Sequence, residues 1–491
     1  EVGTYTIDPT TGKVTFTPNK DFVGTPVPAT VQAKDANGTL TTATYTPTVK
    51  PVTPVGVNTF TEDIQGAPQS GKPEFKPGKT TINGKEVEVP MDDKVPATFE
   101  DGTTTKTIPG EGTYTVDPDG TVHFTPDKQF KGKGTTMTVV RKDQNGTPVT
   151  AEYTAVVHPA SPEGTEVETA GVQGKVQSGR PTFIGGKVTI DGVEKTVEID
   201  NNVPAKLIDP KTGQEVTTVT IDGEGTYTVA EDGTVTFTPD KNFKGKGTEL
   251  TVKRVDKNGT PALGKYSAVV IGVKPTAEPS VTSDIQGQTQ SQPVKFKGGI
   301  VEVENPTTKV KTEEVVAIDP TTYTLLDENG QPATEVPAKD PKGNVIGKYT
   351  LTTEPGKDPV AVFTPTDKTY SGEVKPVTVQ AKDTNGTAVT TTYTPNITPV
   401  TPTAKGVTSE GAQGQEQSGT PTFTEGHEKA PIDPTVPAKL IDPETGEPTD
   451  ETSVTVPGEG TYTINPQTGE VTFKPEPNFT GKAQGVEVQR K

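Results

Sequence analysis

The sequence predicts an all-β protein that consists of consecutive β-sandwich domains of roughly 110 residues each. A motif typical of a β-hairpin occurs five times, with its first tyrosine at Tyr5, Tyr114, Tyr227, Tyr349 and Tyr462. Successive tyrosines are 109, 113, 122 and 113 residues apart, which is the length of one all-β domain and not of a solenoid repeat. Leucine is rare, which leaves helices little to pack with, whereas valine and threonine, which favour strands, are abundant.

The hairpin motif is clearest between residues 112 and 126, where it reads G-T-Y-T-V-D-P-D-G-T-V-H-F-T-P. Alternation places Tyr114, Val116, Val122 and Phe124 on one face of a pleated pair and the threonines on the other. Proline and glycine between the two runs favour a tight turn. The five tyrosines could stack on sugars or bases, but their alternation with aliphatic residues favours core positions, with hydroxyls that reach backbone partners at the sandwich edge.

A second hairpin follows in the first four copies. Its turn is Asp-x-Asn-Gly, and Asn-Gly is the strongest short hairpin signal in a sequence. The strand that returns from this turn carries Tyr45, Tyr153, Tyr266 or Tyr393. Upstream, glutamine-rich stretches that start at Gln65, Gln173, Gln286 and Gln413 predict an irregular segment and then a strand. About seven short strands per copy are typical of a two-sheet, immunoglobulin-like sandwich.

These patterns predict five domains, called repeats 1 to 5 below, with bounds 1–52, 53–160, 161–274, 275–398 and 399–491. Repeat 1 is expected to be the C-terminal part of a copy, and repeat 5 is expected to lack its C-terminal part. Repeat 4 has extra residues at 302–319 and 353–359, where turns are expected. Proline- and threonine-rich linkers at 46–55, 157–164, 271–280 and 396–406 are expected to be semi-rigid and to hold the domains in an extended line.

Composition argues against several classes of function. The net charge of −18 is spread along the chain without a basic patch, so nucleic acid is not an expected partner. No apolar run approaches the roughly 20 residues that span a bilayer, so no membrane insertion is expected. The three histidines, His123, His158 and His427, lie at non-equivalent places in different repeats. No catalytic triad or zinc site can be assembled from them, so we predict no enzyme, and no catalytic, cofactor-binding or metal-binding residues.

Three further kinds of chemistry are less favoured alternatives. Calcium could bind the Asp-x-Asn-Gly turns, but the longer spacing of calcium loops is missing, so backbone turn geometry explains them better. Asn37-Gly38-Thr39 matches a glycosylation acceptor, which we interpret as coincident turn chemistry. An internal Lys-Asn crosslink would stiffen a cysteine-free chain, but Lys34 and Asn37 share one turn and cannot join two strands.

The ordered motifs G-T-Y-T-x-D-P, V-x-F-T-P, F-x-G, R/K-K-D-x-N-G-T and x-Y-T-P resemble the tandem repeat of CshA-type fibrillar surface adhesins of streptococci and related Gram-positive bacteria. Repeat 4 departs from them at Lys348 and Tyr370, and repeat 3 at Val255. The resemblance covers essentially the whole chain. It implies an extracellular, cell-wall-anchored protein whose adhesive tip and anchor lie outside these residues, with other bacterial surfaces and host extracellular matrix proteins such as fibronectin as partners.

The resemblance and the repeats lead to two hypotheses of function. In the first, the repeats form the stalk of a surface fibril and project an adhesive tip for host-cell or interbacterial adhesion. In the alternative, the repeats themselves bind matrix proteins, or one another in a biofilm, and many weak copies add avidity. Outward positions that vary between copies, which we assign to His123, Thr236 and Ala361, favour the stalk, because a binding face should repeat.

Overall fold

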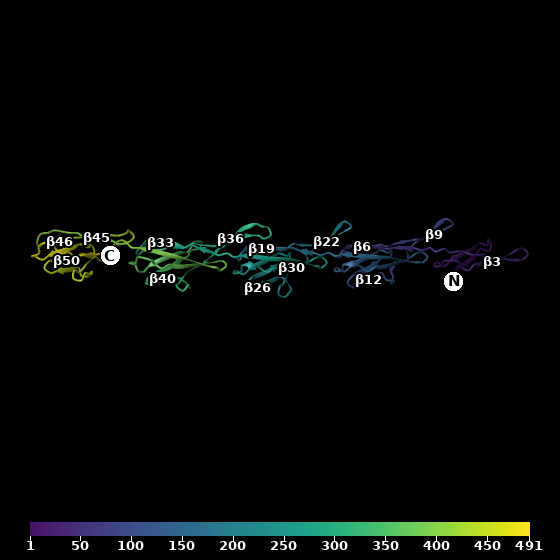
Figure 1. Cartoon of the computed structure of the whole chain (residues 1–491), viewed down its shortest axis with the longest axis horizontal. Helices are drawn as coiled ribbons and strands as arrows, with labels where there is room; N and C mark the ends of the chain where they lie inside the picture. Colours follow the sequence, from purple (N-terminus) through teal and green to yellow (C-terminus); the bar gives the residue numbers. More distant parts are fainter. The chain divides into compact units, whose positions relative to one another are not determined.

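The computed structural model describes residues 1 to 491, all strands and turns without a helix (Figure 1). The structure therefore contains no helix that is long and apolar enough to cross a membrane. The chain divides into two compact units, which are described separately. Unit 1 comprises residues 1–271 and 304–311, and unit 2 comprises residues 272–303 and 312–491.

Repeat 2, in unit 1, is a sandwich of two sheets. The first sheet has the order β11-β16-β17-β15, with β6 parallel to β17. Its strands are β6 (Thr59–Ile64), β11 (Thr98–Phe99), β15 (Gly132–Lys133), β16 (Met137–Lys142) and β17 (Pro148–His158). The second sheet has the order β12-β13-β14-β7. Its strands are β7 (Gln69–Gly71), β12 (Thr105–Ile108), β13 (Gly112–Val116) and β14 (Val122–Pro126). Tyr114 and Phe124 from one sheet and Tyr153 from the other share one core, which confirms the predicted sandwich.

The five-fold hairpin motif forms as predicted. In β13 and β14 Tyr114 lies opposite Phe124 and Val116 opposite Val122, and all four side chains are buried. His123 points outward and is exposed, with its Nε2 2.7 Å from Asp117 Oδ2. The outward assignment of Ala361 in repeat 4 is wrong. Ala361 is fully buried opposite Leu351, because the outward equivalent of His123 is its neighbour Val362, the residue just before Phe363.

Repeat 3, also in unit 1, has the same two sheets. The first runs β19-β31-β30-β24-β25 with β29 beside β31, and the second runs β20-β28-β27-β26. The bounds are β19 (Glu166–Val172), β20 (Gln177–Gly179), β24 (Lys206–Ile208), β25 (Glu215–Val216), β26 (Thr218–Ile221), β27 (Gly225–Val229), β28 (Val235–Pro239), β29 (Gly245–Lys246), β30 (Leu250–Val255) and β31 (Pro261–Ile271). Tyr227, Phe237 and Tyr266 centre a core that belongs to this repeat alone.

Repeat 1 has two hairpins and a weaker interior. They are formed by β1 (Gly3–Ile7) with β2 (Val14–Pro18) and by β3 (Ala29–Lys34) with β4 (Leu40–Tyr45). None of its non-proline apolar side chains is buried, although Tyr5 stacks obliquely on Phe16 with ring centroids 4.7 Å apart. Short pairs then mark the start of the later repeats, namely β5 (Val55–Val57) with β8 (Glu74–Lys76) and β18 (Glu163–Gly164) with β21 (Phe183–Ile184).

A front hairpin that sequence analysis did not predict lies outside the sandwich. It is β9 (Gly78–Ile82) with β10 (Lys85–Val89) in repeat 2, and β22 (Gly186–Ile190) with β23 (Val193–Val197) in repeat 3. Its turns are Asn83-Gly84 and Asp191-Gly192, and all four residues have positive φ, as a two-residue hairpin requires. In repeat 4 the same place holds β36 (Gly299–Glu304) and β37 (Lys311–Val316), and the extra residues near position 302 lengthen this turn.

Unit 2 contains the remaining sheets. In repeat 4 they run β33-β44-β43-β38-β39 and β34-β42-β41-β40. The bounds are β33 (Ser280–Ile285), β34 (Gln290–Pro293), β38 (Ile318–Leu326), β39 (Pro332–Ala333), β40 (Glu335–Lys339), β41 (Val345–Thr352), β42 (Val360–Pro365), β43 (Val377–Asp383) and β44 (Ala388–Thr398), and β32 (Thr276–Ala277) pairs with β35 (Phe296–Lys297). Repeat 5 has one four-stranded sheet, β46-β51-β50-β49, and the pairs β48-β52 and β45-β47. Its strands are β45 (Thr403–Lys405), β46 (Gln417–Gly419), β47 (Thr422–Thr424), β48 (Lys439–Leu440), β49 (Ser453–Val456), β50 (Gly460–Ile464), β51 (Val471–Pro475) and β52 (Val488–Gln489).

Candidate functional site at the repeat junctions

In each glutamine-rich stretch the glutamine four residues after the first one lies in a polar cluster, and in repeats 2, 3 and 4 this glutamine is buried. In repeat 3 Thr169 Oγ1 donates a hydrogen bond to Gln177 Oε1 at 2.7 Å and lies 2.7 Å from the Tyr266 hydroxyl. Because the threonine proton is used on the glutamine, the tyrosine hydroxyl must be the donor in the second contact. Gln177 Nε2 donates to the Val269 carbonyl at 3.0 Å. The cluster therefore joins β19, β20 and β31 inside one sandwich.

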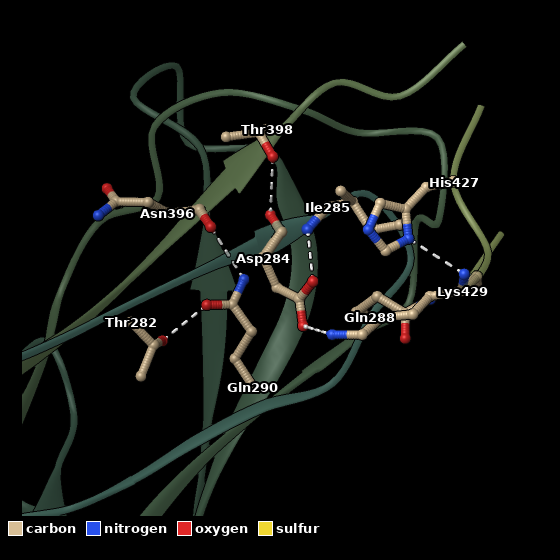
Figure 2. A network of polar contacts seen from close by, with 9 residues as sticks. All are labelled: Thr282, Asp284, Ile285, Gln288, Gln290, Asn396, Thr398, His427 and Lys429. Atoms are coloured by element: carbon tan, nitrogen blue, oxygen red, sulfur yellow. Dashed lines mark hydrogen bonds and ion pairs between the residues drawn. The ribbon is translucent and has the colours of Figure 1, made fainter. Parts of the chain in front are cut away.

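The cluster recurs at equivalent positions. Its members are Thr61, Gln69 and Tyr153 in repeat 2 and Thr282, Gln290 and Tyr393 in repeat 4. Figure 2 shows Gln290 between Thr282 and the carbonyl of Asn396, to which its Nε2 donates at 2.9 Å. In repeat 5 the cluster consists of two residues only, Ser409 and Gln417. Sequence analysis saw these glutamines but interpreted their segment as irregular. Their hydroxyl partner eight residues upstream is the signal that could have revealed the cluster.

The first glutamine of the stretch fastens the linker that leaves the repeat. Gln65 Nε2 donates to the Lys128 carbonyl at 3.1 Å, and Gln65 Oε1 accepts from the Ala160 N–H at 3.1 Å. In repeat 4 Gln286 does the same, since its Nε2 donates to the Thr369 carbonyl at 2.6 Å and its Oε1 accepts from Val400 N–H at 2.7 Å. These two linkers are therefore held by a side chain as well as by their prolines.

In unit 1 an ion pair joins repeat 2 to the front hairpin of repeat 3. Asp63, near the end of β6, accepts the Ile64 N–H on its Oδ1 at 2.7 Å and the Lys195 ammonium from β23 on the same oxygen at 2.8 Å. The exposed fractions of the two side chains are 19% for Asp63 and 37% for Lys195. Partial burial weakens screening by water and salt, so this pair is stronger than a fully exposed one.

In unit 2 a corresponding aspartate–lysine ion pair joins repeat 4 to repeat 5 (Figure 2). Asp284 accepts the Ile285 N–H on Oδ1 at 2.8 Å, and its Oδ2 lies 3.3 Å from Lys429 Nζ of repeat 5. Gln288 Nε2 donates to the Lys429 carbonyl at 3.0 Å, and the Lys429 N–H donates to His427 Nδ1 at 3.1 Å. Asp284 and Gln288 belong to repeat 4 and Lys429 to repeat 5, so the ion pair and the hydrogen bond from Gln288 both join these two repeats.

The Asp-x-Asn-Gly turns use their aspartates internally. Asp256 Oδ1 accepts the N–H groups of Asn258 and Thr260, both at 2.9 Å, and Asp143 and Asp383 do the same in their turns. This geometry supports the interpretation of these residues as turn formers. No group of three histidine, cysteine, aspartate or glutamate side chains has an arrangement that could hold a metal ion.

A buried glutamate beside the hairpin tyrosine was missed by sequence analysis. Glu111 Oε1 accepts the N–H of Thr135 at 2.9 Å and its hydroxyl at 3.1 Å, and Glu224 repeats this with Thr248. Burial, and then the neighbouring Glu111 carboxylate, raises the pKa of Tyr114. The prediction that the tyrosine hydroxyls reach backbone partners holds for Tyr5 and Tyr349, which donate to the Val27 and Lys375 carbonyls at 2.7 and 2.6 Å. It also holds for Tyr462, whose hydroxyl accepts the Gly485 N–H at 3.0 Å, but not for Tyr114 and Tyr227, whose hydroxyls lie buried beside Glu111 and Glu224 without a hydrogen bond of ordinary geometry.

The three histidines do not come together. His123 lies on the outer face of repeat 2, His158 Nε2 is 2.9 Å from Glu62 Oε2 at the end of the same repeat, and His427 is in repeat 5. Each is engaged locally with one acidic or backbone group. The side chains described here therefore tie strands, linkers and repeats together, and this defines the chain as a modular protein of tandem β-sandwich repeats.

The comparison with protein families agrees with the resemblance in the sequence. The family described as the surface adhesin CshA repetitive domain matches residues 1–49, 51–157, 159–270, 272–397 and 399–491. The chain belongs to this family, with five tandem repeats, and is a repeat region of a surface adhesin. This membership points to a structural protein at the outer surface of a cell.

Several solved structures show a distant likeness to the chain. The extracellular domain of protocadherin gamma B4 is 12% identical, with 96% of this chain and 70% of that chain covered and a TM-score of 0.28. A three-domain immunoglobulin segment of titin is 12% identical, with 71% and 97% covered and a TM-score of 0.25. A tetra-tandem repeat from the extending region of a large adhesion protein is 18% identical, with 79% and 85% covered and a TM-score of 0.21. At these scores the likenesses carry no argument. No curated protein matches the chain.

Proposed function

We propose that these repeats are the stalk of a cell-surface fibril that projects an adhesive tip, and that they catalyse no reaction. The observation that carries the proposal is the fastening of the linkers by Gln65 and Gln286, each of which bonds the repeat with one end of its amide and the linker with the other. A stalk needs links that transmit force between domains without free rotation. A string of independent binding modules has no such requirement.

The separate cores support the same role. Repeats 2, 3 and 4 each enclose their own apolar cluster, so pulling on one repeat need not open its neighbours. One outward position of the five-fold hairpin differs between repeats, since it holds His123, Thr236 and Val362 in repeats 2, 3 and 4. A binding face centred on this position would keep it alike in all repeats.

The setting of the stalk is part of the proposal. We place it outside a Gram-positive cell, with a cell-wall anchor and an adhesive tip in segments other than residues 1–491. Host matrix proteins, fibronectin among them, and other bacterial surfaces would then be partners of the tip.

Small-angle X-ray scattering of the whole chain tests the stalk. The longest strand of repeat 2 has 11 residues and therefore spans about 37 Å. Five such domains end to end give a rod of about 190 Å with a radius of gyration of about 55 Å. A compact globule of this chain length would have a radius of gyration of about 23 Å, and an unfolded chain would have one of about 80 Å. A value near 55 Å with the cross-section of one sandwich is expected, and a value near 23 Å would overturn the proposal.

A binding measurement tests the alternative. The whole chain is immobilised and exposed to soluble matrix proteins and, separately, to the same chain in solution. We expect no saturable binding at micromolar concentrations. Saturable binding in either experiment would show that the repeats are binding modules, and the stalk proposal would then be insufficient.

A further inference from the structure

Two junctions between successive repeats share one docking surface. Asp63 and Asp284 occupy the same position, directly before an isoleucine and the glutamine that fastens the linker. Each pairs with a lysine that the following repeat supplies from its front segment, Lys195 at 2.8 Å and Lys429 at 3.3 Å. Because the same ion pair forms at the same position in unit 1 and in unit 2, it is a recurring contact between consecutive repeats.

At the junction of repeats 2 and 3 an apolar contact accompanies the ion pair. Ile64 at the end of β6, Ala160 in the linker and Val197 at the end of β23 form a small buried cluster. Ala67 and Val188 pack against it. Since Ile64 belongs to repeat 2 and Val197 to repeat 3, this cluster excludes water only when the two repeats are docked.

The Asp-x-Asn-Gly turn of repeat 3 adds hydrogen bonds to the same surface. Asn258 Nδ2 donates to the Gln65 carbonyl at 2.9 Å, and the Asn258 carbonyl accepts from Gln129 Nε2 at 2.5 Å. Gly66 allows this approach, because a Cβ there would lie 2.1 Å from Asn258 Oδ1. The turn residue that looked like a possible calcium ligand in the sequence is thus a contact to the preceding repeat.

The front hairpin is placed for this contact by its first glycine. A Cβ on Gly186 would lie 2.4 Å from the backbone nitrogen of Ser161 in the linker, so only glycine lets β22 lie against the linker. Gly426 stands at the corresponding place in repeat 5, where a Cβ would lie 2.4 Å from the Thr401 carbonyl oxygen. Lys195 and Lys429 follow these glycines by nine and three residues. Both front segments therefore present a lysine although only one is a hairpin.

We propose that this surface, which consists of the aspartate and the isoleucine that end strand β6 or β33, is a docking site for the front segment of the next copy of the same domain. The docked contact joins repeats 2 and 3, and repeats 4 and 5, into coupled pairs. Repeats 3 and 5 have Gly171 and Gly411 where the other two have the aspartate, so they lack the charge that receives a lysine. This aspartate is therefore a feature of repeats 2 and 4. For its biological use the inference rests on the proposed stalk, whose bending it would limit.

The absence of cysteine makes the test direct, because two introduced cysteines can carry spin labels in the whole chain. Thr125→Cys in repeat 2 and Thr238→Cys in repeat 3 are exposed and lie at equivalent strand positions. Double electron–electron resonance then reports the distribution of distances between the two repeats. The expected distribution for the unmodified junction is a single narrow peak.

Charge variants of Lys195 should loosen the junction. Lys195→Gln should increase the undocked population about fivefold, the upper range for a half-exposed pair, and Lys195→Glu should broaden the distribution further through repulsion from Asp63. Lys195→Arg keeps the charge and should keep the peak narrow. The matched control is Lys187→Glu, since Lys187 lies on the same hairpin but pairs with Glu194 within it at 3.4 Å. Raising salt to 1 M should act like Lys195→Gln.

The inference is overturned if Lys195→Glu and Lys187→Glu give the same distribution as the parent chain. Amide exchange of Val252 in the core of repeat 3 is measured in every variant, and unchanged protection shows that the repeat itself stays folded. The result is independent of the stalk proposal. Binding of matrix proteins by the repeats would overturn the stalk and leave this distribution as it is, whereas an unaltered distribution in Lys195→Glu would leave the scattering result in place.

Discussion

Thr169 and Gln177 are eight residues apart in sequence and are joined by a 2.7 Å hydrogen bond between their side chains, in which the threonine donates. Both side chains are buried, and the tyrosine hydroxyl of the last strand completes the cluster. Because β19 and β20 lie in different sheets, the bond connects the two layers of the sandwich at one end of the core. The same pair in repeats 2 and 4 makes it a constant feature of the complete domains.

Removal of this glutamine should weaken one repeat specifically. Gln177→Ala leaves the Val269 carbonyl without its donor and the Thr169 hydroxyl without its acceptor, in a site closed to water. Each buried group left unpaired costs about 1–3 kcal/mol, so for the two groups we expect repeat 3 to lose about 2–6 kcal/mol of unfolding free energy. Native-state amide exchange on β19 and β31 in the whole chain measures this loss repeat by repeat.

The matched control for this glutamine is Gln214→Ala in the same repeat, because Gln214 is exposed in a turn and bonds only through its backbone. Its effect should stay within about 0.5 kcal/mol. Equal protection of the β31 amides in the two variants would contradict the structural role of the cluster.

The two tyrosines in the core of repeat 3 should respond differently to loss of the hydroxyl. The Tyr266 hydroxyl is bonded to Thr169, whereas the Tyr227 hydroxyl is buried without a hydrogen bond of ordinary geometry. Tyr266→Phe should therefore cost about 1 kcal/mol, and Tyr227→Phe should be neutral or slightly stabilising. Chemical denaturation followed by amide exchange compares the two variants. A larger loss in Tyr227→Phe than in Tyr266→Phe would show that the assignment of partners is wrong.

The repeat sandwiches were predictable because their signals are local. Alternation about Tyr114 and Phe124, with a proline and a glycine between, fixes a hairpin, and the Asp-x-Asn-Gly turn fixes another. The family follows from the same motifs in the same order. The exact domain bounds stay a prediction, because proline-rich linkers mark an approximate region and not a residue.

The junctions could not be predicted in this way because their partners are far apart in sequence. Lys195 meets Asp63 across 132 residues, and no spacing rule connects them. The front hairpin of repeat 2 was missed although Asn83-Gly84 is a strong turn signal, since its flanking residues alternate with lysine and glutamate and bury little. The misplacement of Ala361 has a related cause: the longer turn of repeat 4 obscured the register, and a shift of one residue reverses the face.

Gly186→Ala should weaken the contact between the front hairpin and the linker. The new methyl group would lie 2.4 Å from the Ser161 nitrogen and 2.7 Å from the Ala160 carbonyl carbon, so the backbone must move. We expect a loss of about 1–3 kcal/mol for opening of β22 and β23, with the repeat 3 sandwich unchanged. Gly406→Ala is the control, because a Cβ there meets open space. Amide exchange of Val188 and Val197 provides the measurement, and equal rates in both variants would contradict the steric argument.

Alkaline pH should unfold the repeats through their buried tyrosines. Burial, and then the Glu224 carboxylate, raises the pKa of Tyr227, so the folded chain keeps a proton that the unfolded chain loses above about pH 10. The stabilisation is complete below that pH and falls by about 1.4 kcal/mol per pH unit above it for each such tyrosine. In Tyr227→Phe the unfolding free energy of repeat 3 should depend less steeply on pH above about 10, by the amount that corresponds to one proton. Tyrosinate absorbance that rises near pH 10 without loss of the β-sheet signal would contradict this linkage.

Amide protection should rank the repeats by how much apolar surface each encloses. Val31, Val139, Val252 and Val379 have equivalent positions in the strand before the Asp-x-Asn-Gly turn, with the same pairing to the return strand. The last three are fully buried, whereas repeat 1 buries none of its non-proline apolar side chains. Val31 should therefore exchange by local opening, at least about a hundredfold faster than its counterparts. Residues 480–491 should also exchange quickly, because β52 has only two residues and repeat 5 fully encloses few side chains. Protection at Val31 equal to that at Val252 would mean that hairpin pairing alone, without a core, stabilises these strands.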